Sequence, residues 1–503
     1  MELFNNLVFG FTVALTLQNL WYCFIGVFLG TLIGVLPGIG PLATIAMLLP
    51  ITFNVPPVAA LIMLAGIYYG AQYGGSTTAI LVNLPGETAA VVTCIDGYQM
   101  ARQGRAGPAL AIAAIGSFFA GTVCTLIIAL FGPPLAEVAL KFGAPEYFSL
   151  MLMGLVAAAV LAGDNITKAL AMVVMGLLLG IVGTDVNSGM ARYSFGVPEL
   201  TDGIGFIVIA VGVFAVGEII ANLGDPEERK VFTNKLSGLM PTMHDLKVSM
   251  GPIARGTGIG AFLGVLPGTG PAIASFSSYM LEKKLAKDPS RFGKGAIEGV
   301  AGPESANNAD AQCKFIPTLT LGIPASAVMA LMLGALTIQG IAPGPQVMTQ
   351  KPDLFWGLVA SMWIGNAMLV ILNLPLVGLW VMLLKVPYRL LFPAIMAFSC
   401  IGIYSVNNSP FELYLTAIFG IIGFIWMKLE MPPAPMLLGF VLGPLMEENL
   451  RRALLISRGD PTVFFTRPIS LGFMIATALI VVVMVLPAVK ARRAAITDPA
   501  APR

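Results

Sequence analysis

Two copies of one short motif hold the residues best suited to bind a small anion. Residues 34–41 read GVLPGIGP and residues 264–271 read GVLPGTGP, so only one position differs. Proline lacks a backbone N–H and glycine adopts almost any backbone angle, so each motif should end one helix and begin another. Helices that begin at Pro41 and Pro271 would present free N–H groups and positive dipole ends to an anion. We therefore expect anion contacts from Gly38, Gly40, Gly268, Thr269 and Gly270.

Carbonyl groups before each break could hold a cation. The preceding helices should end near Leu36 and Leu266, where the last carbonyl oxygens have no partner within the helix. Secondary transporters use such oxygens to coordinate Na⁺. Both motifs could instead be packing kinks, but their duplication favours a binding role.

Uncharged polar side chains interrupt two further apolar stretches, residues 61–92 and 302–333. Polar groups are costly at membrane depth, so they should face the interior of the helix bundle. Hydroxyl and amide groups can bind carboxylate oxygens without the desolvation cost of a full charge. Each residue alone could equally fill a tight helix interface. As a group, we expect substrate contacts from Ser76, Thr77, Thr78, Asn83, Ser305, Asn307, Asn308 and Ser326.

Charged side chains are few near these breaks. The nearest acids are Glu87, Glu304 and Asp310, and the nearest base is Lys314. These groups could couple transport to protons or ions, or they could pair with one another. We expect ion coupling to involve Glu304, Asp310, Thr318 and the carbonyls of Leu36 and Leu266.

The elements that position these residues should be membrane helices. Of the 503 residues, 57% are hydrophobic and 11% are charged, and the mean hydropathy is +0.87. Soluble domains have about 25% charged residues. Several apolar runs approach the length of about 20 residues that crosses a bilayer, and none shows the alternation of an outer-membrane barrel. We predict an all-α polytopic membrane protein with about 10–12 transmembrane helices.

The duplicated motif divides the chain into two repeats. We assign residues 1–223 to the first membrane repeat, 224–255 to a polar connecting loop, 256–493 to the second membrane repeat and 494–503 to a C-terminal tail. Residues 51–58 carry no charge, whereas the matching residues 282–294 hold five Lys and Arg. By the positive-inside rule these loops lie on opposite faces, so the repeats should have inverted topology with broken helices or re-entrant hairpins.

The sequence gives little reason to expect an enzyme. The only histidine, His244, lies in the polar connection, which excludes an HExxH zinc site and a Ser-His-Asp triad within the membrane. The chain has no GxxxxGK[ST] motif to bind ATP, and its five cysteines form no CxxC pair. A net charge of +2 gives no reason to expect nucleic acid. We expect no enzyme, no cofactor and no metal beyond a coupling Na⁺.

Longer motifs extend over most of the chain. They are GVLPGIGP at 34–41, YYGAQYGGSTTAILVNLPGE at 68–87, GPESANNADA at 302–311, LTLGIPAS at 319–326 and ENLRRALLISRGD at 448–460. Together they resemble the large membrane subunit of the tripartite tricarboxylate transporters of bacteria. The resemblance implies a cytoplasmic (inner) membrane subunit that takes up carboxylates by symport with Na⁺ or H⁺. It also implies a small four-helix membrane subunit and a periplasmic solute-binding protein as partners. Substrates in such systems include citrate, tartrate and aromatic carboxylates.

Two rival functions fit the same features. A passive anion channel would conduct after the ion gradient is collapsed, and it would need no binding protein. A non-transporting membrane scaffold would tolerate the loss of Asn307 or Ser76. In every case we expect the lipid bilayer as a further partner.

Overall fold

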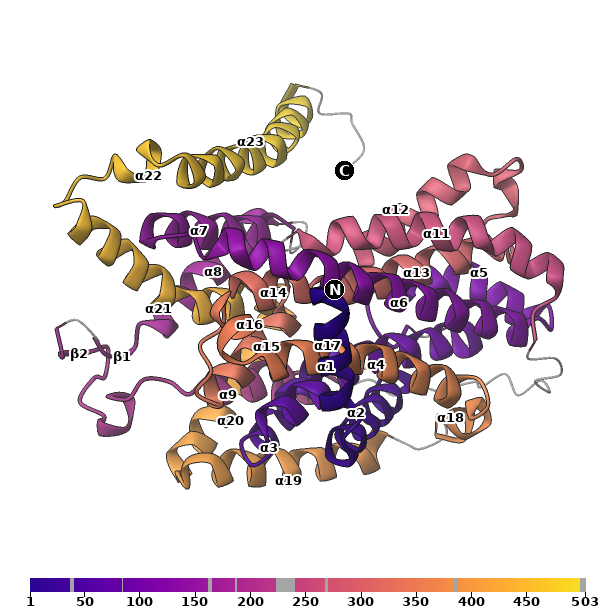
Figure 1. Ribbon diagram of the computed structural model, residues 1–503, viewed down its shortest axis with the longest axis horizontal. Coiled ribbons are helices and arrows are strands. Elements are labelled where there is room, and N and C mark those ends of the chain that lie inside the picture. Colours follow the sequence, from indigo (N-terminus) through magenta and orange to yellow (C-terminus); the bar gives the residue numbers. More distant parts are fainter. Residues whose placement is uncertain are drawn as a thin grey trace. The chain divides into compact units, whose positions relative to one another are not determined.

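The computed structural model shows an all-helical protein, as predicted (Figure 1). It describes residues 1–36, 40–83, 85–161, 165–185, 188–222, 240–266, 270–383 and 388–497. Among these described residues, the only strands are β1 (Gly183–Thr184) and β2 (Ala191–Arg192), which pair antiparallel.

The chain forms two compact units. Unit 1 comprises Met1–Leu140 and Gly205–Glu430, and unit 2 comprises Lys141–Ile204 and Met431–Arg503. Each predicted repeat contributes to both units, and the predicted repeat boundaries stay a prediction.

Unit 1 contains most of the helices. Those before residue 223 are α1 (Glu2–Ala14), α2 (Leu17–Val35), α3 (Pro41–Thr52), α4 (Pro57–Val82), α5 (Ala90–Arg102), α6 (Ala106–Ala139), α9 (Phe206–Ala210), a π-helical segment (Val211–Val216) and α10 (Gly217–Asn222). Those after it are α11 (Met243–Val265), α12 (Pro271–Leu285), a 3₁₀ turn (Pro289–Arg291), α13 (Glu298–Cys313), α14 (Phe315–Leu321), α15 (Ala327–Ile338), α16 (Gln346–Gln350), α17 (Pro352–Asn373), α18 (Val377–Leu383), α19 (Tyr388–Asn407) and α20 (Pro410–Lys428).

Unit 2 is held together by helix packing and by an ion-pair network. It contains α7 (Ala144–Leu161), α8 (Ile166–Gly180), a 3₁₀ turn (Pro198–Leu200), α21 (Pro433–Ile456), α22 (Val463–Thr466) and α23 (Pro468–Thr497). A Cβ on Gly176 would lie 2.0 Å from the Met436 carbonyl oxygen, so α8 and α21 are in close contact. Arg451 pairs with Asp185 at 3.0 Å and with Glu447 at 2.6 Å.

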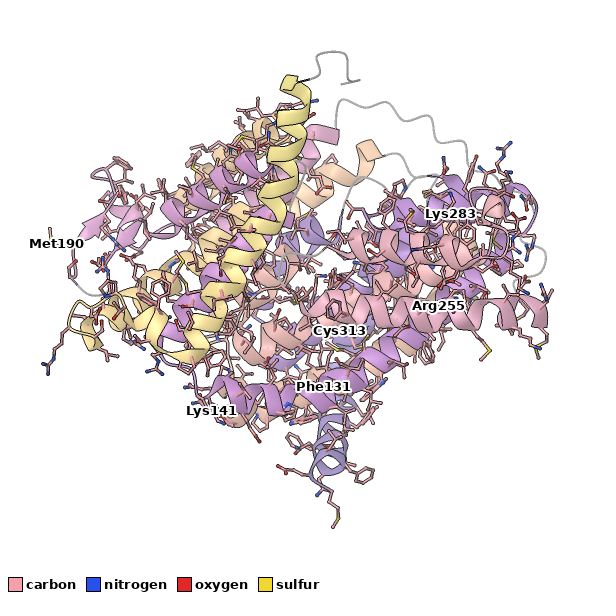
Figure 2. All side chains as sticks on the ribbon, turned by 90° about the horizontal axis from the view of Figure 1, so that it is seen from above. Phe131, Lys141, Met190, Arg255, Lys283 and Cys313 are labelled. Carbon is pink, nitrogen blue, oxygen red and sulfur yellow. The ribbon has the colours of Figure 1, made fainter. Side chains whose placement is uncertain are left out.

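The described helices include several that suit a membrane. By length and hydropathy, α2, α6, α17 and α20 could each cross a bilayer alone. Shorter apolar helices include α3, α7, α8, α15 and the stretch Phe206–Ala221. Exposed apolar side chains lie along such helices, among them Phe131 of α6 (Figure 2). This pattern is typical of a multi-pass membrane protein.

The sequence duplication extends to the helix packing of unit 1. Helix α2 packs on α4, and α11 packs on α13 in the same manner. A Cβ on any of three glycines of α2 would lie 2.3–2.5 Å from a carbonyl oxygen of α4, and for three glycines of α11 against α13 the range is 2.2–2.6 Å. The glycines are offset by 230 residues and their partners by 239. The pairs are Gly26–Met63, Gly30–Ile67, Gly34–Ala71, Gly256–Gly302, Gly260–Ala306 and Gly264–Asp310.

Both predicted helix breaks occur at the duplicated motif. Helix α2 ends at Val35 and α3 begins at Pro41, while α11 ends at Val265 and α12 begins at Pro271. A Cβ on Gly40 or Gly270 would meet no atom within 4 Å, so there is open space where the second helix of each pair begins. The described residues do not include Gly38, Gly268 and Thr269 of the two motifs. Anion contacts by these three residues stay a prediction.

The second pair of breaks is also duplicated. Asn83, with φ 58°, directly follows α4, and Gly322, with φ 70°, directly follows α14. Both residues therefore adopt the left-handed conformation that closes a helix, and they are again 239 positions apart. Asn83 is exposed, and the structure assigns it this helix-ending role.

Part of the predicted connecting loop is helical. Residues 223–239 lie outside the described chain, but α11 already begins at Met243, so residues 243–255 belong to a helix. A capping box starts it, because the Thr242 hydroxyl accepts from the Asp245 N–H and the Asp245 carboxylate accepts from the Thr242 N–H.

Replacing Gly260 with alanine should destabilise unit 1. The new methyl would lie 2.2 Å from the Ala306 carbonyl oxygen and 2.7 Å from the Ala309 methyl. Overpacking of this kind costs about 1–3 kcal/mol, so the thermal unfolding temperature of the purified protein should fall. Gly258→Ala on the same helix is the control, since its Cβ would meet nothing within 4 Å. Equal unfolding temperatures for the two variants would refute the close-packing account.

Candidate functional site

The polar parts of α4 and α13 meet inside unit 1. The Ser76 hydroxyl donates to Glu304 Oε2 at 2.6 Å, and Asn307 Nδ2 donates to Glu87 Oε1 at 2.8 Å. All these side chains except that of Glu87 are buried, and Glu87 is half-buried. The structure thus brings together polar groups from the two segments that the sequence analysis singled out.

The bridges between the two segments are reciprocal. Asn307 of the second segment donates to Glu87 of the first, and Tyr68 of the first interacts with Ser326 of the second. Asn307 lies 239 residues after Tyr68, and Ser326 lies 239 residues after Glu87. Equivalent positions therefore bind each other in both directions, which is the pattern of a twofold axis. Inverted and parallel repeats can both have such an axis, so the inverted topology stays a prediction.

Glu304 is surrounded by hydroxyl groups from two other helices. Besides Ser76 of α4, the Thr93 hydroxyl of α5 donates to Glu304 Oε1. A narrow cavity beside the carboxylate is also lined by Tyr73, Thr77 and Ser117. Thr93 carries no signal in the sequence, because it is a single hydroxyl in a stretch that we did not identify as polar.

Two amide side chains face the Glu87 carboxylate. Asn307 donates its Nδ2 to it, and Gln72 also interacts with it. Gln72 Oε1 and Asn307 Oδ1 are both buried and have no hydrogen-bond partner among the described residues. An unpaired buried acceptor costs about 1–3 kcal/mol, so a bound cation, proton donor or water at these oxygens would be favourable.

Asp310 and Lys314 form a fully buried ion pair at the junction of α13 and α14. Both side chains are 0% exposed. Asp310 Oδ1 has no hydrogen-bond partner among the described residues. Both residues interact electrostatically with Glu87. Asp310, predicted to couple ions, therefore has Lys314 as its direct partner.

Both helix breaks lead to this charged cluster. A Cβ on Gly86 would lie 2.0 Å from the Gly34 carbonyl oxygen, which places the end of α2 directly beside the residue before Glu87. A Cβ on Gly264 would lie 2.6 Å from the Asp310 carbonyl oxygen, which places the end of α11 beside the buried ion pair. The cluster therefore connects the ends of both broken helices.

A fourth acid lies at the start of α3. The Gly40 N–H donates to Glu218 Oε1 at 3.4 Å. Glu218 directly follows the π-helical segment Val211–Val216 and Gly217, and π-helical turns are frequent at functional sites. The sequence analysis missed Glu218, although a single acid in an apolar run of membrane length is a recognisable signal.

Other predicted site residues bind mainly within their own helices. Asn308 Nδ2 donates to Ser117 Oγ of α6 at 2.7 Å and to the Glu304 carbonyl at 3.1 Å, so it joins α13 to α6. Ser326 also caps α15, accepting from the Met329 N–H at 3.3 Å. Four predicted residues donate their hydroxyls to backbone carbonyls three or four positions earlier in the same helix: Thr77, Thr78, Ser305 and Thr318. The backbone N–H groups of Leu36 and Leu266 donate to carbonyls three positions earlier. Substrate or ion contacts by these six stay a prediction.

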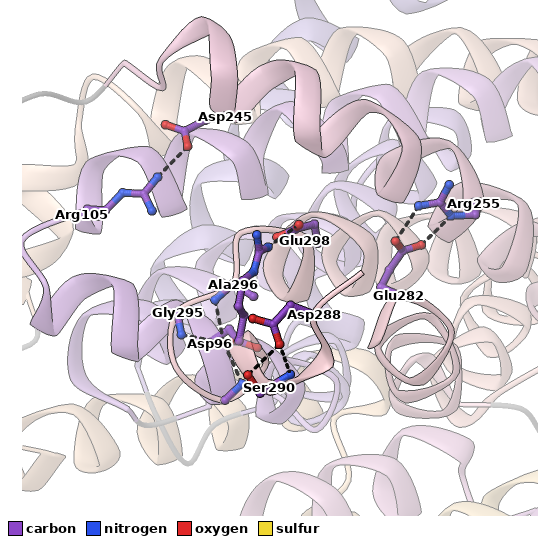
Figure 3. Close-up of polar contacts among 12 residues, drawn as sticks. Asp96, Arg105, Asp245, Arg255, Glu282, Asp288, Ser290, Gly295, Ala296 and Glu298 are labelled. Carbon is purple, nitrogen blue, oxygen red and sulfur yellow. Dashed lines mark hydrogen bonds and ion pairs between the residues drawn. The ribbon is translucent and has the colours of Figure 1, made fainter. Parts of the chain in front are cut away.

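Helix α5 also holds the loop that leads into α13 (Figure 3). The buried Asp96 carboxylate accepts from the backbone N–H groups of Gly293, Gly295 and Ala296 at 2.7–2.9 Å. It also accepts from the Tyr279 hydroxyl at 2.9 Å. Gly293 and Gly295 have φ of 83° and 100°, a conformation that favours glycine. Asp96 thereby sets the position at which α13, with Glu304, begins.

Replacing Asp96 with asparagine should loosen α13. One oxygen would be replaced by an N–H₂ donor and the charge would be lost, so several charge-assisted hydrogen bonds would weaken. We expect a loss of about 3 kcal/mol in the free energy of unfolding, measured by denaturation of the purified protein. Asp288→Asn in the same loop is the control, because among the described residues that carboxylate accepts hydrogen bonds from Ser290 alone. Similar losses for both variants would argue against a special role for Asp96.

Comparison with known proteins adds independent information. A family model described as "Tripartite tricarboxylate transporter TctA family" matches residues 20–438, which include every site residue described above. An "Uncharacterized 52.8 kDa protein in TAR-I ttuC' 3'region" of Agrobacterium vitis is 60% identical over 493 residues, 98% of each chain. An "Uncharacterized protein in TAR-II ttuC' 3'region" of the same organism is 60% identical over 234 residues, 46% of this chain and 97% of that protein. No solved structure matches the chain.

Proposed function

Because the chain belongs to the tripartite tricarboxylate transporter TctA family, we propose that it takes up small di- or tricarboxylates by symport with Na⁺ or H⁺. The proposed location is the bacterial cytoplasmic membrane. The proposed partners are a small four-helix membrane subunit and a periplasmic solute-binding protein. Membership of a transporter family implies a transport role in place of catalysis.

The imbalance of buried charge is the observation that carries this proposal. Glu87, Glu304 and Asp310 contribute three carboxylates to the cluster, and Lys314 contributes one ammonium group. A buried charge is very costly unless it is paired or neutralised. Two of the carboxylates therefore need bound cations or protons, which is what a cation-coupled transporter requires.

The same charge imbalance explains how binding of a coupling cation and binding of a carboxylate substrate could each strengthen the other. An anionic substrate would be repelled by an uncompensated Glu87 or Glu304, so its affinity should rise once a cation or proton is bound. By linkage, the substrate raises the affinity for the cation by the same factor. Donor groups for the substrate would come from Lys314, from Asn307 and from the N-terminus of α12 at Gly270.

Uptake into membrane vesicles tests the proposal. Vesicles should contain the chain with and without its two partners, and a panel of labelled carboxylates should be supplied under an imposed Na⁺ or H⁺ gradient. We expect concentrative uptake only with a gradient and with both partners. Flux that continues after the gradient is collapsed, without the binding protein, would instead show a passive anion channel.

Single substitutions separate transport from a scaffold role. Ser76→Ala and Asn307→Ala each remove one hydrogen bond to a carboxylate of the cluster. Such a bond is worth about 1.5–3 kcal/mol, so uptake should fall about 10-fold or more. Ser405→Ala is the control, since that hydroxyl is exposed and donates to the carbonyl of Ile401 in its own helix. Unchanged uptake in both site variants would favour a non-transporting scaffold.

A further inference from the structure

A second cavity in unit 1 shares no lining residue with the narrow cavity beside Glu304. Its volume is about 410 Å³, which is within the range of small-molecule sites. It opens between Arg105, the start of α11 and the loop that leads into α13. Its polar lining includes Arg105, His244, Asp245, Arg291, Lys294 and Glu298.

The lining has an excess of positive charge. Its two acids already have partners, because Asp245 pairs with Arg105 at 2.6 Å and Glu298 pairs with Arg291 (Figure 3). Lys294 forms no ion pair within 4 Å among the described residues and interacts with the Asp288 carboxylate only at longer range. Its side chain is exposed at the cavity. An anionic group beside Lys294 would therefore meet a free ammonium group and the outer faces of two arginines.

One acceptor atom of the lining, Glu298 Oε2, would bind a hydrogen-bond donor. Glu298 Oε2 is buried and has no hydrogen-bond partner among the described residues, since Arg291 binds the other oxygen. A buried acceptor of this kind favours a donor such as an alcohol hydroxyl. The cavity is thus suited to a ligand that carries both an anionic group and a free hydroxyl.

The wall that holds Lys294 is preformed. Gln103 Nε2 donates to the Lys294 carbonyl at 2.7 Å, and the Asp96 carboxylate binds the backbone N–H groups on both sides of that residue. Because the loop is already ordered, little conformational entropy would be lost when a ligand binds.

The surroundings resemble a membrane interface. Met243 and Met250 of α11 are exposed apolar side chains. Lys283 (Figure 2) and Lys284 form the basic end of α12. Basic loops face the cytoplasm by the positive-inside rule, and the cytoplasmic leaflet holds anionic lipids. A phosphate ester with a glycerol hydroxyl combines the charge and the donor that the cavity lacks.

We infer that this cavity binds a glycerol phosphate ester, with the phosphate at Lys294 and a hydroxyl at Glu298. The group could belong to the headgroup of phosphatidylglycerol or to soluble glycerol 3-phosphate. Both share the chemistry that the lining recognises, and the experiment distinguishes them.

Native mass spectrometry of the purified chain tests this inference. The protein should be supplied with phosphatidylglycerol, with phosphatidylcholine or with glycerol 3-phosphate, and the bound fraction measured for each. We expect preferential binding of phosphatidylglycerol, weakened about fivefold by Lys294→Gln. Lys287→Gln is the matched control, because that lysine lies in the same loop but does not line the cavity. It should bind as the wild type does.

The alternative results have clear meanings. Binding of glycerol 3-phosphate that is sensitive to Lys294→Gln, without lipid preference, would support the site and assign it a soluble ligand. Equal binding of both lipids and no binding of glycerol 3-phosphate would overturn the inference. Equal binding by the Lys294 and Lys287 variants would also overturn it. Because binding is measured directly, the result does not depend on whether the chain transports carboxylates.

Discussion

Glu304→Gln should abolish concentrative uptake while the protein remains folded. Glutamine keeps the shape of the side chain, but it can neither carry a negative charge nor release a proton. The Ser76 and Thr93 hydroxyls both donate to the carboxylate, and each hydrogen bond to a charged group is worth about 1.5–3 kcal/mol. Glutamine keeps one acceptor oxygen, so one hydroxyl loses its acceptor and the other hydrogen bond loses its charge. A combined cost of about 3 kcal/mol corresponds to about a 100-fold decrease in the uptake rate.

The measurement is initial uptake of labelled carboxylate, normalised to the amount of folded protein in the vesicles. Glu448→Gln serves as the control, since its side chain is 49% exposed and lies in unit 2. It should transport as the wild type does. Wild-type uptake by Glu304→Gln, with the same dependence on the ion gradient, would rule out Glu304 as the coupling group.

Lys314→Met should destabilise the protein strongly. The substitution would leave the Asp310 carboxylate buried without its cation, and breaking a buried pair in this way costs about 3–5 kcal/mol. The double variant Asp310→Asn/Lys314→Met removes both charges, so most of the lost stability should return. Uptake should remain low in the double variant, because the cluster would lack both its ammonium group and one carboxylate.

Thermal unfolding of the purified variants measures the first effect and vesicle uptake the second. Arg452→Met is the matched control: Arg452 pairs with Glu448 at the same four-residue spacing, but the two side chains are 60% and 49% exposed. Such an exposed pair contributes at most about 1 kcal/mol. Normal uptake by the double variant would show that the buried pair serves only the fold.

Local composition determined the class of the protein and the places where its helices break. Hydropathy alone predicts membrane helices, because the cost of placing polar groups in lipid depends on residue type. Proline and glycine act on their own backbone, so the breaks before Pro41 and Pro271 were predictable from the motif. Asn83 and Gly322 end helices for the same local reason.

Tertiary structure decided which polar groups work together. Ser76 and Ser305 look alike in the sequence, yet one reaches Glu304 of the other segment and the other donates only to its own helix. The difference depends on how each helix is rotated against partners more than 200 residues away, and no local pattern records that rotation. The pairing of Asp310 with Lys314 follows the four-residue spacing of neighbours on one helix face, so it could be expected from the sequence. Thr93, by contrast, could be found only from the tertiary structure.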